Sequence, residues 1–166
     1  MIDTMTRFLA GVNPPATSFF LRKIIEPLVD RCSTHPLISA NLVITGAGGT
    51  AAKIGATDFY ASCGGILVKI AAGTVMPALT GINIAANAFN VVSFFVDSVG
   101  VVTLGSGTAG PTLARVVLQA PPLRKATVGL LIITSASPFV GGTTALDTAT
   151  TVYISPTGAF DPTVLV

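Results

Sequence analysis

The fold is decided by the stretch Asn90–Leu104, which reads NVVSFFVDSVGVVTL. Its first half alternates between two sets of side chains: Val92, Phe94 and Val96 on one side, and Val91, Ser93, Phe95 and Asp97 on the other. A period of two is typical of a β-strand, because successive side chains point to opposite faces of the sheet. Turn residues follow at 97–100, and a second apolar run returns at Val101–Leu104. The stretch therefore predicts an antiparallel hairpin.

Short apolar runs between turn residues continue this pattern along the chain. They predict strands at Leu42–Thr45, Asp58–Ser62, Ile66–Ile70, Thr127–Thr134 and Thr150–Ser155. Thr127–Thr134 is apolar on both faces, so we expect a central strand that is covered on each side. The segment Thr112–Gln119 fits either a short helix or a strand. About seven to nine short strands predict a mainly β fold, either an antiparallel β-sandwich or a jelly-roll-like barrel.

The residues before Pro36 follow a different period. Between Ser18 and Arg31 the apolar residues recur at steps of three and four, which predicts a short amphipathic helix. Pro27 is expected to kink or end this helix near Glu26. We therefore divide the chain into an extended N-terminal arm with a helix, residues 1–36, and a β domain, residues 37–166.

The predicted helix has apolar side chains around more of its circumference than packing against a single domain requires. A helix that packs on one domain requires only one apolar stripe. We therefore expect part of the helix to contact another molecule. The residues that we assign to this contact are Phe19, Phe20, Leu21, Ile24, Ile25 and Leu28.

The composition indicates a protein whose surface is largely covered by other molecules. Only 10% of the 166 residues are charged, 51% are hydrophobic, and the mean hydropathy is +0.78. Globular domains normally have about a quarter of their residues charged. So few charges leave weakly polar areas on the surface, and such areas mark interaction sites. Copies of the chain or a partner protein are expected to cover them.

Membranes and nucleic acids are not expected partners. The uncharged stretches 70–96 and 126–146 are interrupted by glycine, proline, asparagine and serine, so neither reads as a membrane helix. The opening residues Met1–Asp3 do not predict a secretory signal. The formal net charge of +2 is too small to indicate binding to a nucleic acid.

The sequence offers little for catalysis, so we do not expect an enzyme. His35, the only histidine, adjoins Pro36, and nothing in the local sequence pairs it with Cys63. Asp58, Asp97, Asp147 and Asp161 stand singly in turns and near strand ends, so neither a metal nor a cofactor is expected. A disulfide between Cys32 and Cys63 is possible, but reduced thiols are the expected state.

One glycine-rich segment matches the spacing of a nucleotide-binding motif, but its surroundings do not fit such a site. Residues 105–110, Gly-Ser-Gly-Thr-Ala-Gly, match the spacing G-x-G-x-x-G. A dinucleotide site also needs a helix that opens inside the motif and an acid about 20 residues later. Pro111 follows the motif directly, and the next acid is Asp147. The motif is therefore expected to be a flexible turn.

The stretch from Ile82 to Phe160 has a recognisable order of short elements. They are Ile84–Asn87, the aromatic strand that ends at Asp97, Gly100–Thr103, Ala120–Pro122, Lys125, Val128–Ile132, Phe139 and Gly142–Asp147. This order resembles that of small virion structural proteins of tailed bacteriophages, the capsid decoration (cement) and fibre-type components. The resemblance covers about half of the chain. It implies a β-rich, often trimeric protein that clamps the capsomers of an icosahedral shell.

The expected function is that of a capsid decoration or cement protein on the outer surface of a phage head. Its partners would be other copies of the chain, as a homo-oligomer and most simply a trimer, and the major capsid protein. It would be located in the virion and assembled in the cytoplasm of a bacterial host. Another virion component, such as a fibre base, neck or tube subunit, is the alternative. A receptor- or carbohydrate-binding module is a further alternative, although the chain has no Trp and only two Tyr.

Overall fold

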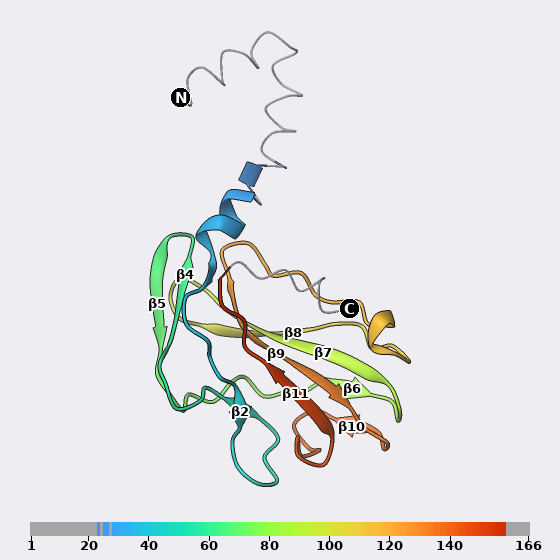
Figure 1. Ribbon diagram of the computed structural model, residues 1–166. Helices are drawn as coiled ribbons and strands as arrows, with labels where there is room; N and C mark the ends of the chain where they lie inside the picture. The colour runs from blue at the N-terminus through green and yellow to red at the C-terminus, as the bar shows by residue number, and fades with distance from the viewer. Residues whose placement is uncertain (1–22, 24, 27, 159–166) are drawn as a thin grey trace, which may run out of the picture.

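The computed structural model describes residues 23, 25–26 and 28–158. This part of the chain is mainly β, and every pairing between its strands is antiparallel. It contains eleven strands, several of them only two residues long, and one 3-10 helix. The predicted fold class is confirmed, and two packed sheets give it a sandwich-like form (Figure 1).

The larger sheet is built around the predicted hairpin. It consists of β7 (Phe89–Val96), β8 (Val102–Ser106), β9 (Ala126–Thr134) and β11 (Thr150–Ile154), in the order β11-β9-β7-β8. In the turn between β7 and β8, the Asp97 carboxylate accepts hydrogen bonds from the amides of Val99 and Val101, at 3.1 and 3.0 Å. Gly100 adopts a φ of 85° there, a conformation that glycine tolerates without a steric cost.

The second sheet packs against one face of the first. It contains β1 (His35–Pro36), β4 (Phe59–Cys63) and β5 (Ile66–Ile70), in the order β1-β4-β5. Side chains from both sheets form one core, among them Phe59, Val68, Phe94 and Leu131. Alternation along β4, where every second residue is buried, follows from this one-sided packing.

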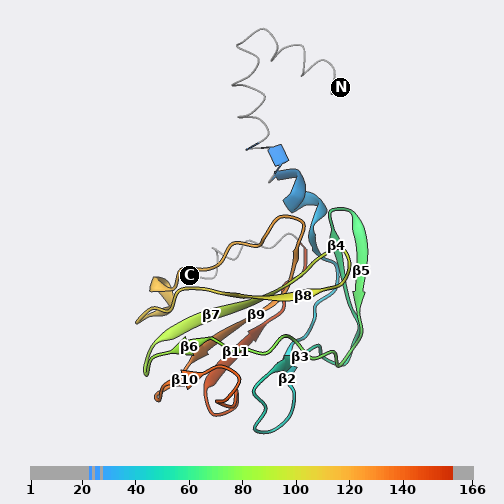
Figure 2. The same ribbon diagram turned by 180° about the vertical axis from the view of Figure 1, so that it is seen from behind.

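Two short strand pairs complete the sandwich. They are β2 (Val43–Ile44) with β3 (Ala52–Lys53), and β6 (Asn83–Ile84) with β10 (Phe139–Val140). In Figure 2 both pairs lie at the end of the body that is farthest from the helix. The segment after β11 runs beside β1, where the Gly158 amide donates to the Pro36 carbonyl oxygen at 2.7 Å.

The outer face of the larger sheet is covered by the segment between β8 and β9. A second core cluster forms there from Val91, Val116 and Leu130. Within the undecided stretch 112–119, the 3-10 helix η1 (Leu113–Arg115) comes first, and Val117 then forms an extended bridge with Thr108. Strand β9 is thus buried on both faces over most of its length, as its sequence predicts.

The glycine motif at 105–110 differs from the flexible turn that its composition predicts. Gly105 belongs to β8, and the chain continues extended, with Gly107 donating to the Val91 carbonyl at 2.9 Å. Close packing explains this use of glycine. A Cβ atom at Gly105 would lie 2.6 Å from Cε2 of Phe95 and 2.7 Å from Oε1 of Gln119.

Helical residues lead into the body at one end (Figure 1). Residues 23, 25–26 and 28–33 are helical, and the last of them lies two residues beyond Arg31, where the sequence predicts the end of the helix. Pro27, where the sequence predicts a kink or an end, lies outside the described residues. The following residues, His35 and Pro36, pair with Ser62 and Ala61 of β4. The sheet therefore begins inside the segment 1–36 that the sequence assigns to the arm. Within the described residues, no helix is long and apolar enough to cross a membrane.

Candidate interaction surface at the base of the helix

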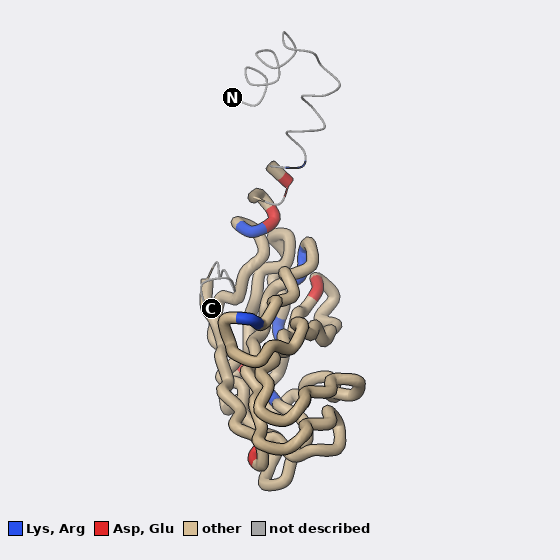
Figure 3. The backbone as a smooth tube through the Cα atoms, turned by 90° about the vertical axis from the view of Figure 1, so that its right-hand side faces the viewer, with Lys and Arg blue, Asp and Glu red and all other residues tan. Residues whose placement is uncertain are grey.

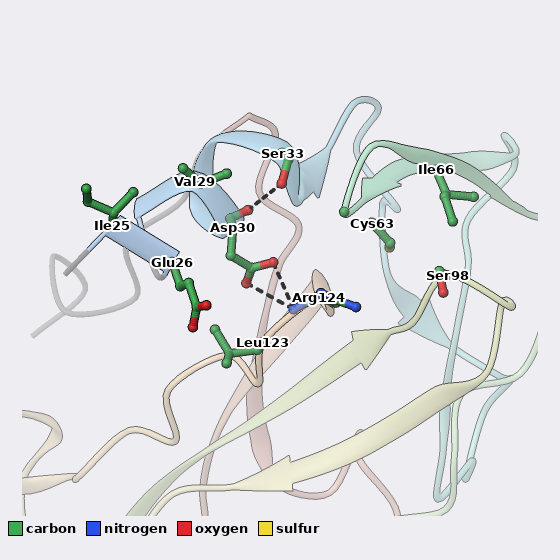
Figure 4. A pocket seen from close by; sticks show the side chains of 11 residues that line it. Ile25, Glu26, Val29, Asp30, Ser33, Cys63, Ile66, Ser98, Leu123 and Arg124 are labelled. Atoms are coloured by element: carbon green, nitrogen blue, oxygen red, sulfur yellow. Dashed lines mark hydrogen bonds between the residues drawn. The ribbon is translucent and has the colours of Figure 1, made fainter. Parts of the chain in front are cut away.

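A groove of about 600 Å³ lies where the helix meets the β body. Four parts of the chain form its walls: the helix, the β4–β5 turn, the β7–β8 turn and the loop at 123–124 (Figure 4). We call this site the helix-base groove. Because its walls come from segments that are far apart in sequence, its shape depends on how the helix is held against the body.

Asp30 holds the helix to the loop that precedes β9. Its two carboxylate oxygens accept hydrogen bonds from the Arg124 amide at 3.0 and 2.9 Å (Figure 4). Oδ1 also accepts a hydrogen bond from the Thr34 hydroxyl at 3.0 Å. Arg124 has a φ of 60°, which is uncommon for a residue other than glycine. The charged acceptor stabilises this turn, because hydrogen bonds to an ionised group are stronger than neutral ones.

The last helical turn is also connected to the β4–β5 turn. The carbonyl oxygen of Ser33 accepts the Gly65 amide at 3.1 Å and the Ser62 hydroxyl at 2.7 Å. The Thr34 hydroxyl oxygen accepts the Gly64 amide at 2.9 Å. These bonds satisfy backbone groups at the helix end that have no partner within the helix. The loop at 123–124 and the β4–β5 turn are therefore both held by the C-terminal end of the helix.

Four exposed apolar side chains stand on the rim of the groove, next to the polar side chains of Glu26, Ser98 and Arg124. The fractional exposures are 40% for Ile25, 57% for Val29, 55% for Ile66 and 64% for Leu123, and Leu28 beside them reaches 60%. Exposed apolar side chains that gather in one place mark an interaction site more clearly than single ones do. The helix-base groove is therefore the candidate functional site of this chain.

Two of the six predicted contact residues can be placed. Ile25 lines the groove, and Leu28 is exposed next to it. Phe19, Phe20, Leu21 and Ile24 lie outside the described residues.

The structure does not bring His35 and Cys63 together. His35 lies opposite Ser62 in the register, so the two residues share one face of the sheet, and Cys63 points to the other. The Cys63 thiol is 1% exposed and donates to the Val96 carbonyl at 3.4 Å. Burial raises the pKa of this thiol, which disfavours the reactive thiolate. Both cysteines are free; Cys32 is exposed.

Acidic side chains elsewhere in the described residues have structural contacts. Asp58 pairs with Lys69 at 2.7 Å, and the hydrogen bond from Lys69, followed by one from the Ala72 amide, lowers the pKa of Asp58. Asp147 accepts the Gly48 amide at 2.7 Å. No group of three or more His, Cys, Asp or Glu residues that could hold a metal ion occurs in the described part of the chain.

The sequence did not predict the groove or the role of Asp30. The hydrogen bonds from Arg124 span 94 residues, and no local pattern relates the two positions. The one available signal was Pro121–Pro122, which indicates a turn before Leu123 and Arg124. Comparisons of the chain with protein-family models, curated proteins and solved structures found no match.

Proposed function

We propose that this chain is a virion structural protein that decorates the outer surface of an icosahedral phage head and stabilises it. The observation that carries the proposal is the group of exposed apolar side chains on the rim of the helix-base groove. Hydrogen bonds between the end of the helix and the β body hold the walls of this groove in place. Such a surface suits lasting attachment to another protein rather than turnover of a substrate. The phage resemblance of residues 82–160 supplies the identity of the expected partner, the major capsid protein.

The proposed mechanism is a clamp across neighbouring capsid subunits. Charged residues are few along the chain, and most of the tube in Figure 3 has the tan colour of residues that are neither basic nor acidic. Attachment would therefore depend on apolar burial, at about 25 cal/mol per Å² of buried area. Several copies joined in an oligomer would hold more tightly than one, because linked contacts raise the overall avidity.

Particles assembled with and without the protein provide the test. Genome release on heating is followed by the fluorescence of a dye that binds free DNA. We expect release at a lower temperature from particles that lack the protein, and restoration when purified protein is added. Equal release temperatures would contradict the clamp.

A matched pair of variants locates the contact. Leu123→Gln removes an apolar side chain from the groove rim, whereas Val140→Gln removes one that is 45% exposed in β10, at the far end of the body. Leu123→Gln is expected to weaken binding to the particles by about tenfold. Val140→Gln is expected to bind as the unmodified chain does. Equal effects of the two variants would place the contact elsewhere.

A further inference from the structure

Strand β5 is an outer strand of the second sheet. It comes last in the order β1-β4-β5, and β4 is the only described strand with which it pairs. The other edge of an outer strand presents N–H and C=O groups without a ladder partner, and another extended chain can bond to them. The outer edge of β5 is therefore a candidate binding surface.

The register shows which backbone groups of β5 face outward. The Tyr60 carbonyl oxygen accepts a hydrogen bond at 2.8 Å from an amide that follows β1, so the backbone groups of Tyr60 point toward β1. Successive residues of a strand direct these groups to opposite sides, so Ala61 bonds to its register partner Val68 in β5. The neighbours of Val68 in β5, Leu67 and Lys69, therefore each present an N–H and a C=O to the outer edge.

The other outer strands of the two sheets lie beside segments of the same chain. The Gly158 amide bonds to β1, and the Leu42 amide donates to the Ser155 hydroxyl oxygen at 3.0 Å, directly after β11. Beside β8, Lys125 Nζ donates to the Thr103 hydroxyl oxygen at 3.1 Å. Within residues 23, 25–26 and 28–158, no segment is hydrogen-bonded in this way to the outer edge of β5. The described chain therefore leaves β5 as the strand to which a partner can add.

The lysine of β5 does not block this edge. Lysine side chains on outer strands commonly prevent pairing with other chains. Lys69 instead lies over the face of the second sheet, where its Nζ pairs with Asp58 at 2.7 Å and is 5.9 Å from the centre of the Tyr60 ring. Leu67, the other residue with outward backbone groups, is 65% exposed. The edge is therefore accessible to an uncharged segment.

Exposed apolar side chains connect the edge with the helix-base groove. Ile66, the first residue of β5, also lines the groove. On the core side of β5, a Cβ atom at Gly100 would lie 3.9 Å from Val68 Cγ1, which places the β7–β8 turn beside the strand. Val99 and Val101 of this turn are 80% and 54% exposed. One extended segment can therefore leave the groove, follow β5 and cover these side chains.

We propose that the outer edge of β5 binds an extended segment of the shell protein, which adds to the second sheet as a further strand. The inference rests on the proposed function and names the main-chain contact by which the partner is held. Hydrogen bonds to Leu67 and Lys69 would fix the segment, and the exposed apolar side chains beside β5 would be buried by it.

Hydrogen exchange of the full-length protein tests this contact. Protein bound to particles that were assembled without it is transferred to deuterated water, and exchange is resolved to single residues by fragmentation in the mass spectrometer. We expect the amides of Leu67 and Lys69 to exchange about tenfold more slowly in the bound than in the free protein. The amide of Val140, at the far end of the body, should exchange equally in both states. Unchanged exchange of Leu67 and Lys69 in bound protein would overturn the inference.

Two variants at one position separate main-chain from side-chain binding. Leu67→Pro removes an outward N–H without removing a bond to β4, and outer strands accept proline at such positions. Leu67→Ala shortens the side chain but keeps the N–H. We expect Leu67→Pro to bind the particles about tenfold more weakly than Leu67→Ala does. Circular dichroism checks the fold of both variants, and the exchange measurement decides if Leu67→Pro does not fold. Equal binding of two folded variants would overturn the inference.

The outcomes separate this inference from the proposed function. Slower exchange of Leu67 and Lys69 on particles whose genome release is unchanged would contradict the clamp and support the added strand. Stabilised particles without slower exchange would contradict the added strand alone, and absence of binding would contradict both. If the same amides slow when purified protein is concentrated without particles, the occupant is a second copy, and the inference is overturned.

Discussion

The carboxylate of Asp30 connects three parts of the chain. It accepts hydrogen bonds from the Arg124 amide and the Thr34 hydroxyl, and the Thr34 hydroxyl oxygen in turn accepts one from the Gly64 amide. We expect Asp30→Asn to lower the free energy of unfolding by about 0.5–1.5 kcal/mol, since it replaces a charged acceptor of an exposed amide and a part-buried hydroxyl. Glu26→Gln is the control, because Glu26 is an exposed acid of the same groove. Denaturant unfolding measures both. Equal losses would show that the carboxylate of Asp30 has no special role.

The two cysteines should differ strongly in reactivity. Cys32 is exposed and should be alkylated readily in the folded protein, whereas Cys63 is buried. Burial raises the pKa of the Cys63 thiol, so its alkylation should require unfolding. Mass spectrometry of labelled peptides distinguishes the two sites. Labelling of both at the same rate in native protein would contradict the burial of Cys63.

The same shift predicts how stability depends on pH. Because the pKa of Cys63 is higher in the folded than in the unfolded state, its contribution is complete at lower pH. It is lost as the pH rises above about 8.5, where the thiol of the unfolded chain ionises first. Cys63→Ser should therefore reduce the fall in stability on the alkaline side. An identical alkaline slope in that variant would contradict the prediction.

Strand β9 shows how tightly one element is packed between the others. Gly129 of β9 lies close to Leu42, and a Cβ atom there would overlap Leu42 Cδ1 and lie 2.9 Å from the Ile154 carbonyl oxygen. We expect Gly129→Ala to lower the free energy of unfolding by about 1–3 kcal/mol through overpacking. Gly46→Ala is the control, since nothing lies within 4 Å of its Cβ position. If Gly129→Ala is no more destabilising than Gly46→Ala, the close approach of Leu42 and Ile154 to Gly129 is contradicted.

Elements with a local pattern were predictable from the sequence. The hairpin of β7 and β8 follows from the alternation around Phe94, and the bounds of β5, Ile66–Ile70, match the predicted run. Pairs such as β6 with β10 were not predictable, because Asn83 meets Val140 across a long stretch of chain and each strand has two residues. The groove was missed for the same reason, since tertiary packing alone joins the helix to Arg124.

At the scale of the whole molecule, the boundary between arm and body can be tested by truncation. Deletion of residues 1–28 keeps Asp30, Ser33 and Thr34, so we expect the free energy of unfolding to change by less than about 1 kcal/mol. Deletion of residues 1–36 also removes β1 and these bonds, and a loss of several kcal/mol, on the order of 3 or more, is expected. Denaturant unfolding of the two truncated chains decides this. Equal stabilities would show that the helix end and β1 contribute nothing to the body.

The balance of charged and apolar surface predicts how attachment to a particle responds to salt. The chain has nine Lys and Arg against seven Asp and Glu, and four exposed apolar side chains, Ile25, Val29, Ile66 and Leu123, stand on the rim of the helix-base groove. At about 1 M salt the Debye length falls to about 3 Å, so exposed ion pairs are screened, whereas apolar burial is not weakened. We therefore expect the protein to remain bound when decorated particles are washed at this ionic strength and pelleted.

Two rim variants separate the contributions of charge and apolar area to that attachment. Leu123→Gln should reduce the bound fraction at every salt concentration, because it removes apolar area that salt does not screen. Arg124→Gln removes only a neighbouring charge and should have little effect. Complete detachment of the unmodified protein at moderate salt, or a larger effect of Arg124→Gln than of Leu123→Gln, would mean that ion pairs hold it. The apolar rim would then not be the surface by which this chain clamps a shell.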